Sequence, residues 1–241
     1  MAGKQEWDWE ADKELKRSGQ AFLTELVHQW AALPAGSADT AAVREEIRSV
    51  FNALAGCRGK ETVCVGCRAT ENFINQQSFL AGTAWPLLAA TPLRTEQAEL
   101  LAELTRPNFG VRLADSIARL GMPTERYGWD VQATHALALI RSGKGKKAQV
   151  AVKRLNRKVS MNELKGRLRR NYTNELQLCE ILQGLQAAVA NDHEAARQHL
   201  ENARQLRDHL SPQASPLAAE IERRLAGAPA VEPAPTNKKE S

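Results

Sequence analysis

Aromatic residues are scarce in this chain of 241 residues, where Phe, Trp and Tyr together make up 5% and only two tyrosines occur. β-branched residues are also sparse, while alanine, leucine, glutamine, glutamate and arginine dominate. This balance favours helix over sheet, because aromatic and β-branched side chains are the ones that suit a pleated surface. The 43% of apolar residues are enough to bury a core. We therefore expect an all-α fold, a multi-helix bundle.

Long apolar runs are missing as well. No stretch approaches the roughly 20 apolar residues that cross a bilayer, so we expect no membrane partner. The first nine residues are polar and of mixed charge, unlike a signal peptide. Three of the four cysteines lie close together, which is poor spacing for disulfides and agrees with a reducing compartment. These features predict a cytoplasmic protein.

Sequence motifs for catalysis are also lacking. The five histidines form no two-histidine metal helix, and no serine stands in a Gly-x-Ser-x-Gly turn. The run from Gly143 to Lys147 has glycines and lysines, but it lacks the earlier glycine and the following Ser or Thr of a phosphate-binding loop. We expect a hinge that presents lysines there, and a protein that is not an enzyme.

Basic residues, by contrast, are concentrated in residues 141 to 170. Twelve of these thirty side chains are basic and Glu163 alone is acidic, so the segment carries +11 in a chain of net charge +5. Such a concentration of charge attracts polyanions, and nucleic-acid phosphates are the commonest ones. The candidate nucleic-acid-binding residues are Lys144, Lys146, Lys147, Lys153, Arg154, Arg157, Lys158, Lys165, Arg167, Arg169 and Arg170.

Three interpretations of the basic segment stay open. It can contact the phosphate backbone, or it can be an exposed surface that only keeps the protein soluble. Third, Ser160 to Glu163 has the form of a capping box, so residues 147 to 170 could form a helix-turn-helix whose second helix enters a groove of nucleic acid. Only Tyr172 lies near the segment, so stacking on bases is unsupported.

Three cysteines in a glycine-rich stretch suggest a metal. Cys57, Cys64 and Cys67 include a Cys-x2-Cys pair, which is half of a zinc knuckle or part of an iron–sulfur site. We expect zinc as the cofactor, with an iron–sulfur cluster as the lesser alternative. A fourth ligand would have to come from Cys179 or from a histidine such as His28. The alternative is that these are reduced cysteines in a turn, and Cys179 lies at core spacing in its helix.

The C-terminal part carries the one family resemblance. Gly184, Ala196, Leu200 and Ala203, with a turn at Asn191, stand at the spacings of the packing residues in a tetratricopeptide helix pair, so residues 173 to 209 resemble one such unit. In that family paired helices bind partner proteins. No second copy occurs at a period of 34 residues. The resemblance therefore implies a helical hairpin and a protein partner.

The segments combine into a predicted organisation of three parts. Residues 1 to 142 form an N-terminal helical region that contains the cysteine turn. Residues 143 to 226 form the basic helices and helical hairpins, and residues 227 to 241 form a disordered, proline-rich tail. The sequence predicts a non-catalytic subunit or regulator that binds RNA or DNA. The alternative is a helical adaptor that binds a protein through its C-terminal helix pairs.

Overall fold

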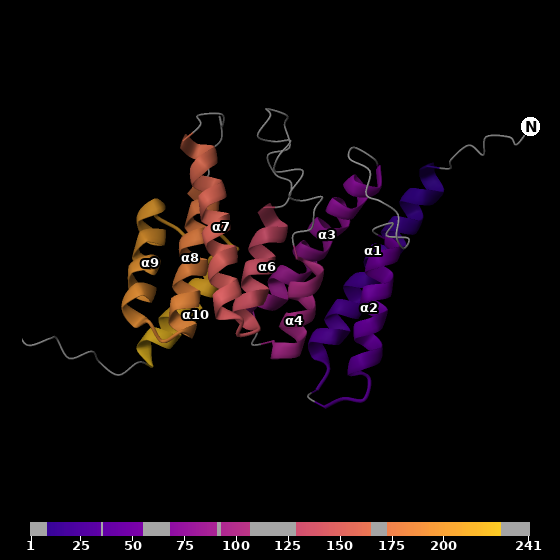
Figure 1. Ribbon diagram of the computed structural model, residues 1–241, viewed down its shortest axis with the longest axis horizontal. Helices are drawn as coiled ribbons and strands as arrows, with labels where there is room; N and C mark the ends of the chain where they lie inside the picture. Colours follow the sequence, from indigo (N-terminus) through magenta and orange to yellow (C-terminus); the bar gives the residue numbers. More distant parts are fainter. Residues whose placement is uncertain are drawn as a thin grey trace, which may run out of the picture. The chain divides into compact units, whose positions relative to one another are not determined.

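The computed structural model describes residues 9–34, 36–54, 68–90, 93–106, 129–164 and 173–227 (Figure 1). Every regular element in these ranges is an α-helix, which confirms the all-α prediction. The chain divides into two compact units, residues 1–172 and 173–241. We call them the N-terminal unit and the C-terminal unit and describe each by itself.

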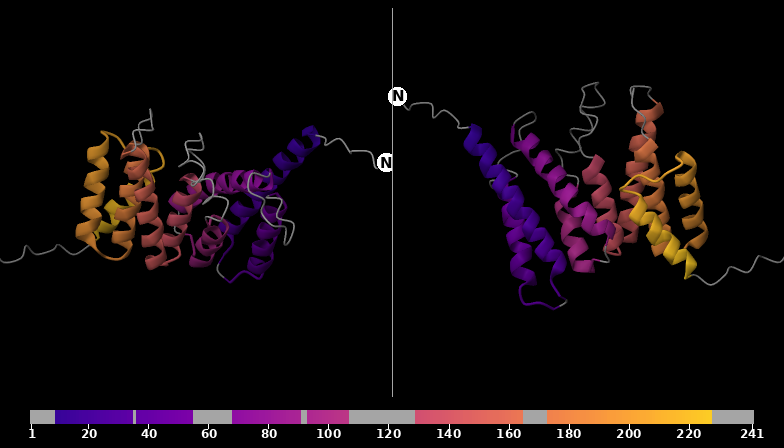
Figure 2. Two further views of the ribbon diagram at one scale, coloured as in Figure 1. Left: turned by 45° about the horizontal axis from the view of Figure 1, so that its top comes forward. Right: turned by 180° about the vertical axis from the view of Figure 1, so that it is seen from behind.

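The N-terminal unit is built around α6. Its described helices are α1 (Trp9–Ala32), α2 (Thr40–Leu54), α3 (Arg68–Ala90), α4 (Thr95–Leu104), α6 (Trp129–Arg141) and α7 (Gly145–Leu164). Helix α6 packs against α3, α4 and α7, while α1 and α2 pair with each other and contact α3 (Figure 2). Nine of the ten residues of α6 from Val131 to Ile140 are buried, and His135 is the exception. Helix α6 therefore forms the centre of this unit.

Two buried glutamines hold α4 between its neighbours. The side-chain amide of Gln97 donates to the carbonyl oxygen of Trp30, at 2.6 Å, where α1 ends. In the same way Gln77 of α3 donates at 3.0 Å to the carbonyl oxygens of Leu104 and Arg106, where α4 ends. The last carbonyls of a helix lack partners within the helix, so these bonds satisfy groups that would otherwise be buried without one. They fix the position of α4 relative to α1 and α3.

A tight turn joins α6 to α7, as the sequence predicts for Ser142 and Gly143. Gly143 has a φ of +69°, which glycine adopts without strain. Its amide donates to Ile140, and the amide of Lys144 donates to Leu139, the pair of bonds that closes a Schellman motif. The helix of the basic segment therefore begins directly beside α6 and packs against it.

The helix-turn-helix interpretation is wrong within the described residues. Helix α7 runs without interruption from Gly145 to Leu164, so residues 157 to 160 continue a helix instead of forming a turn. Ser160 lies inside this helix and does not begin one. The physical reason is that residues 157 to 160 contain no glycine or proline, the residues that most strongly end a helix.

The C-terminal unit contains the predicted helical hairpin. Helices α8 (Thr173–Val189) and α9 (His193–Leu206) pack together, and α10 (Ser215–Ala226) covers both. Asn191 takes a φ of +62° in the turn, and the carboxylate of Asp192 caps α9 by accepting from the amide of Ala195 at 3.1 Å. At Gly184 a Cβ would lie 3.2 Å from the Cδ1 atom of Ile221, so the absence of a side chain permits the close packing of α10 on α8.

A third buried glutamine locks this unit. Gln177 donates to the carbonyl oxygens of Ala203, at 3.1 Å, and His209, at 3.2 Å, and accepts from the amide of Ser211 at 2.8 Å. It therefore ties α8 both to the end of α9 and to the loop that leads into α10. The predicted tail begins at Gly227, and residues 228–241 lie outside the described residues. The predicted boundary between residues 142 and 143 falls in the α6–α7 turn, within the N-terminal unit.

Candidate nucleic-acid interface

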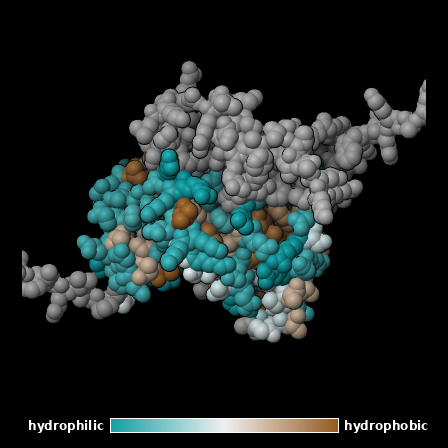
Figure 3. Space-filling model, viewed as in Figure 1, coloured by the Kyte–Doolittle hydropathy of each residue, from teal (hydrophilic) through white to brown (hydrophobic). Residues whose placement is uncertain are grey.

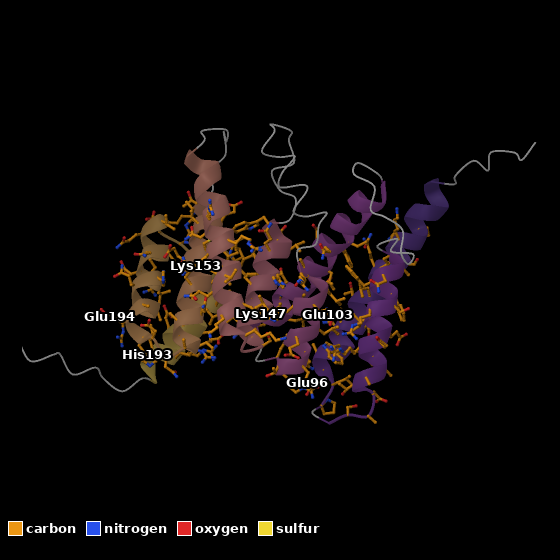
Figure 4. All side chains as sticks on the ribbon, viewed as in Figure 1. Glu96, Glu103, Lys147, Lys153, His193 and Glu194 are labelled. Atoms are coloured by element: carbon orange, nitrogen blue, oxygen red, sulfur yellow. The ribbon has the colours of Figure 1, made fainter. Side chains whose placement is uncertain are left out.

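Helix α7 buries one side and offers cations on the others. Ala148, Val152 and Leu155 are buried, at the spacing of one helical face, and α7 packs against α6. Five predicted site residues on the remaining sides are exposed, and none makes an ion pair within the part of the chain that the structure describes. They are Lys146, Lys147, Lys153, Arg154 and Arg157. Lys147 and Lys153 are labelled along α7 in Figure 4.

The other predicted residues divide into two groups. Lys144 is half-buried and pairs with Glu99 of α4, with its Nζ atom 2.9 Å from Oε1. Lys158 belongs to helix α7, but its side chain is outside the described residues. The last four predicted cations also lie outside the described residues, and they are Lys165, Arg167, Arg169 and Arg170.

Part of α7 forms one wall of a groove of about 730 Å³. The other walls come from α2, from α4 and the residues after it, and from α6. Six cationic and two acidic side chains line the groove, so the charge of its lining is +4. They are Arg44, Arg106, Lys144, Lys146, Lys147 and Arg154, with Glu99 and Glu103. Among the described residues, the lining includes no Phe, Trp or Tyr.

Both carboxylates of the groove are neutralised by neighbours. Glu99 is held by Lys144, and Glu103 accepts from Arg48 through both of its oxygens, at 3.0 and 2.6 Å. The hydrogen bond from Arg48 lowers the pKa of Glu103, with a smaller contribution from Arg44, whose Nη2 atom lies 3.6 Å away. These exposed pairs contribute little stability. Their effect is to leave Arg106, Lys146, Lys147 and Arg154 as the cations that have no acidic partner among the described residues.

His135 lies on the α6 wall of the groove. Its Nδ1 atom is 2.8 Å from the carbonyl oxygen of Ala102. A carbonyl oxygen only accepts, so Nδ1 carries the hydrogen and donates it. The pKa of His135 is lowered to about 4, mainly by burial and to a smaller extent by the charges of Arg106 and Arg154, while the hydrogen bond to Ala102 opposes the shift. The ring is therefore neutral at pH 7, with a free electron pair on Nε2.

The groove assembles residues that the sequence analysis missed. Arg44, Arg106 and His135 stand far apart in the chain and share no motif with the basic segment. Only the packing of α4 and α7 on the two sides of α6 brings Arg106 and His135 close to Arg154. No local pattern could have identified them.

The predicted metal site consists of three cysteines that follow α2 in the chain. Cys57, Cys64 and Cys67 lie outside the described residues. Within the described ranges no three His, Cys, Asp or Glu side chains are grouped as a metal site would require. Cys179 is a core residue of the C-terminal unit, and burial raises the pKa of its thiol. A buried neutral thiol of this kind packs as a small apolar side chain.

The surface and the helices show two further properties. On the face drawn in Figure 3 the described surface is mostly hydrophilic, with small and separate hydrophobic spots. Among the described helices, none combines the length and the apolar character needed to cross a membrane. Comparison with known proteins gives no match, whether with family models, with curated proteins or with solved structures.

Proposed function

We propose that the protein is a non-catalytic nucleic-acid-binding subunit or regulator that grips phosphates with helix α7 and the groove beside it. The observation that carries this proposal is the set of cations on the solvent-exposed sides of α7, which have no acidic partner among the described residues and lie next to a groove whose lining has a charge of +4. Cations that lack acidic partners remain available to replace the counterions of a polyanion, which is the main source of affinity for nucleic acid.

The arrangement of the cations suits a phosphate backbone. Lys147 and Arg154 are two helical turns apart, about 10 Å along the axis, and both line the groove. Lys153 and Arg157 continue the charge beyond the groove, one turn apart on the same helix. A rigid helix holds these distances fixed, which reduces the entropy lost on binding. The described lining has no Phe, Trp or Tyr, which favours contact with phosphates and sugars over stacking on bases.

Two properties accompany this proposal on the evidence of sequence alone. A cytoplasmic location agrees with the uneven spread of the cysteines, which suits a reducing compartment. A zinc ion bound through Cys57, Cys64 and Cys67 would stiffen the N-terminal unit, with an iron–sulfur cluster as the lesser alternative. Metal analysis of the purified protein tests for zinc, and its visible absorption spectrum tests for an iron–sulfur cluster. Serine at Cys64 should release the metal and lower the melting temperature, because metal binding is coupled to folding.

The second candidate function is a helical adaptor. It is favoured by the C-terminal unit, where α8 and α9 form a hairpin that α10 completes. In that case the hairpin would dock on a protein partner, and the cations of α7 would meet an acidic surface of that partner. The two candidate functions differ in whether the purified protein, without any protein partner, binds nucleic acid.

Binding to labelled oligonucleotides across a salt series distinguishes them. Fluorescence anisotropy with 20-residue single and double strands of RNA and DNA should show binding at low salt that weakens steeply as salt rises. On a duplex, log K falls as log salt rises, and the magnitude of this slope is about 0.9 for each phosphate that is neutralised. We expect a slope that corresponds to several phosphates. No binding to any of the four probes at 20 mM salt would reject the nucleic-acid proposal and favour the adaptor.

A further inference from the structure

One polar atom of the groove is unsuited to phosphate. Nδ1 of His135 donates to the carbonyl oxygen of Ala102, so Nε2 holds the electron pair of the neutral ring. Nε2 has no hydrogen-bond partner among the described residues, and the ring lines the groove. A phosphodiester oxygen carries no hydrogen and cannot bond to such an atom. The groove therefore needs a ligand that offers a hydrogen-bond donor close to its negative charge.

The charged groups around His135 define the rest of that ligand. Arg106 follows α4 and Arg154 lies on α7, and both act electrostatically on the imidazole ring. Glu99 and Glu103 of α4 also line the groove, but Lys144 and Arg48 already pair with them. The ring thus offers an acceptor in a groove that it shares with two guanidinium groups, neither of which has an acidic partner among the described residues. A hydroxyl group beside a phosphate matches this pattern, since the hydroxyl can donate while the phosphate is held by the arginines.

We infer, resting on the proposed nucleic-acid binding, that the groove recognises a ribose 2′-hydroxyl beside a phosphate, so the protein binds RNA in preference to DNA. The 2′-hydroxyl donates its hydrogen to Nε2 of His135, and the adjacent phosphate lies between Arg106 and Arg154. The 2′-hydroxyl is the group that distinguishes RNA from DNA at a given position. Its acceptor here is fixed by the bond from Nδ1 to Ala102, which holds the ring in one tautomer.

The same chemistry exists in a free ribonucleotide, but the surroundings favour a strand. Lys153 and Arg157 are exposed on α7 outside the groove lining. They can contact the further phosphates of a strand, which a mononucleotide does not have. A strand that places one nucleotide in the groove can extend its next phosphates along α7. A free ribonucleotide would use the groove and leave these two cations without a role.

The test compares three matched oligonucleotides on the full chain. RNA, DNA and 2′-O-methyl RNA of one single-stranded 20-residue sequence have the same number of phosphates, but only RNA has the donor. A single hydrogen bond between neutral groups corresponds to about three- to tenfold in affinity. We expect RNA to bind more tightly than either other probe by that factor, at constant salt and pH 7.

Two substitutions locate the preference. The amide nitrogen of asparagine can take the place of Nδ1, so His135→Asn can keep the bond to Ala102 while it removes the acceptor at Nε2. We expect this variant to bind all three probes equally, with DNA affinity unchanged within about twofold. The amide oxygen of glutamine can lie near the position of Nε2 and accept a hydrogen bond there. His135→Gln should therefore retain part of the preference for RNA. Tryptophan fluorescence of each variant confirms that the N-terminal unit is folded.

The outcomes separate this inference from the function on which it rests. Equal binding of the three probes by the wild type overturns the preference for RNA and leaves nucleic-acid binding intact. No binding of any probe overturns the proposed function itself. Displacement of the RNA by adenosine 3′-monophosphate at a concentration near the affinity of the strand overturns the RNA strand as ligand and assigns the groove to free ribonucleotides. If His135→Asn does not fold, the comparison of RNA with 2′-O-methyl RNA on the wild type still decides.

Discussion

Acidification should destabilise the N-terminal unit through His135, and the substitution His135→Asn isolates this effect. Burial lowers the pKa of His135 from 6.5 to about 4 in the folded chain, while the unfolded chain keeps the ordinary value. Between pH 6.5 and pH 4 the unfolded state therefore binds more protons than the folded state. The stability that depends on a neutral His135 is fully present above pH 6.5 and is progressively lost as the pH falls toward 4.

The size of the effect follows from the two pKa values. At pH 5 the unfolded histidine is almost fully protonated and the folded one almost fully neutral. The linkage relation gives a loss of about 2 kcal/mol in the free energy of unfolding between pH 7 and pH 5. His135→Asn lacks the titrating ring, so its free energy of unfolding should fall less over the same interval. The difference between the two proteins, and not either value alone, reports the histidine.

Urea unfolding followed by tryptophan fluorescence is a suitable assay. All five tryptophans lie in the N-terminal unit, and Trp30 and Trp85 are buried there, so the signal reports the unit that contains His135. The variant His28→Asn, which changes an exposed histidine of the same unit, serves as the control. If wild type and His135→Asn lose the same stability between pH 7 and pH 5, His135 is not buried as described, and the argument for its neutral ring fails.

Three further predictions concern packing and charge. Gly184→Val should destabilise the C-terminal unit by about 1–3 kcal/mol, because a Cβ there already lies 3.2 Å from Ile221; an unchanged urea midpoint by circular dichroism would contradict this. Gln177→Leu should cost about 2 kcal/mol or more, because the buried amide of Ser211 loses its acceptor; Gln183→Leu, whose side chain bonds only within α8, is the control and should change stability by less than about 0.5 kcal/mol. Glu99→Gln should release Lys144 and raise the charge of the groove to +5, so affinity for polyanions at low salt should rise; a fall in affinity would show that the ion pair positions Lys144 for binding.

The sequence predicted the helical class and several helix ends for physical reasons that are local. Composition favours helix, and Gly143 can take the positive φ that ends α6. The turn at Asn191 and the packing at Gly184 and Ala196 were expected from the resemblance of residues 173 to 209 to a tetratricopeptide helix pair. The capping box at Ser160 misled the prediction, because residues that cap a helix can also lie inside one when no glycine or proline stops the chain.

The candidate site was predictable only on its α7 side. The cations of α7 are neighbours in sequence, so their accumulation is visible without a structure. Arg106 and His135 reach the groove through the packing of α4 and α7 on α6, which no periodicity encodes. The buried side chains of Gln77 and Gln97 fix α4 in that position, although a glutamine in a sequence is ordinarily expected at the surface.

The most direct test of the central claim compares two variants that each lose three positive charges. The groove variant carries glutamine at Lys146, Lys147 and Arg154, and the control variant carries glutamine at Arg17, Arg197 and Arg223, which are exposed and lie outside the groove. The slope of log K against log salt for a 20-residue duplex should fall by about 2–3 in the groove variant and change little in the control. An equal fall in both variants, or no fall in either, would contradict the assignment of nucleic-acid binding to α7 and its groove.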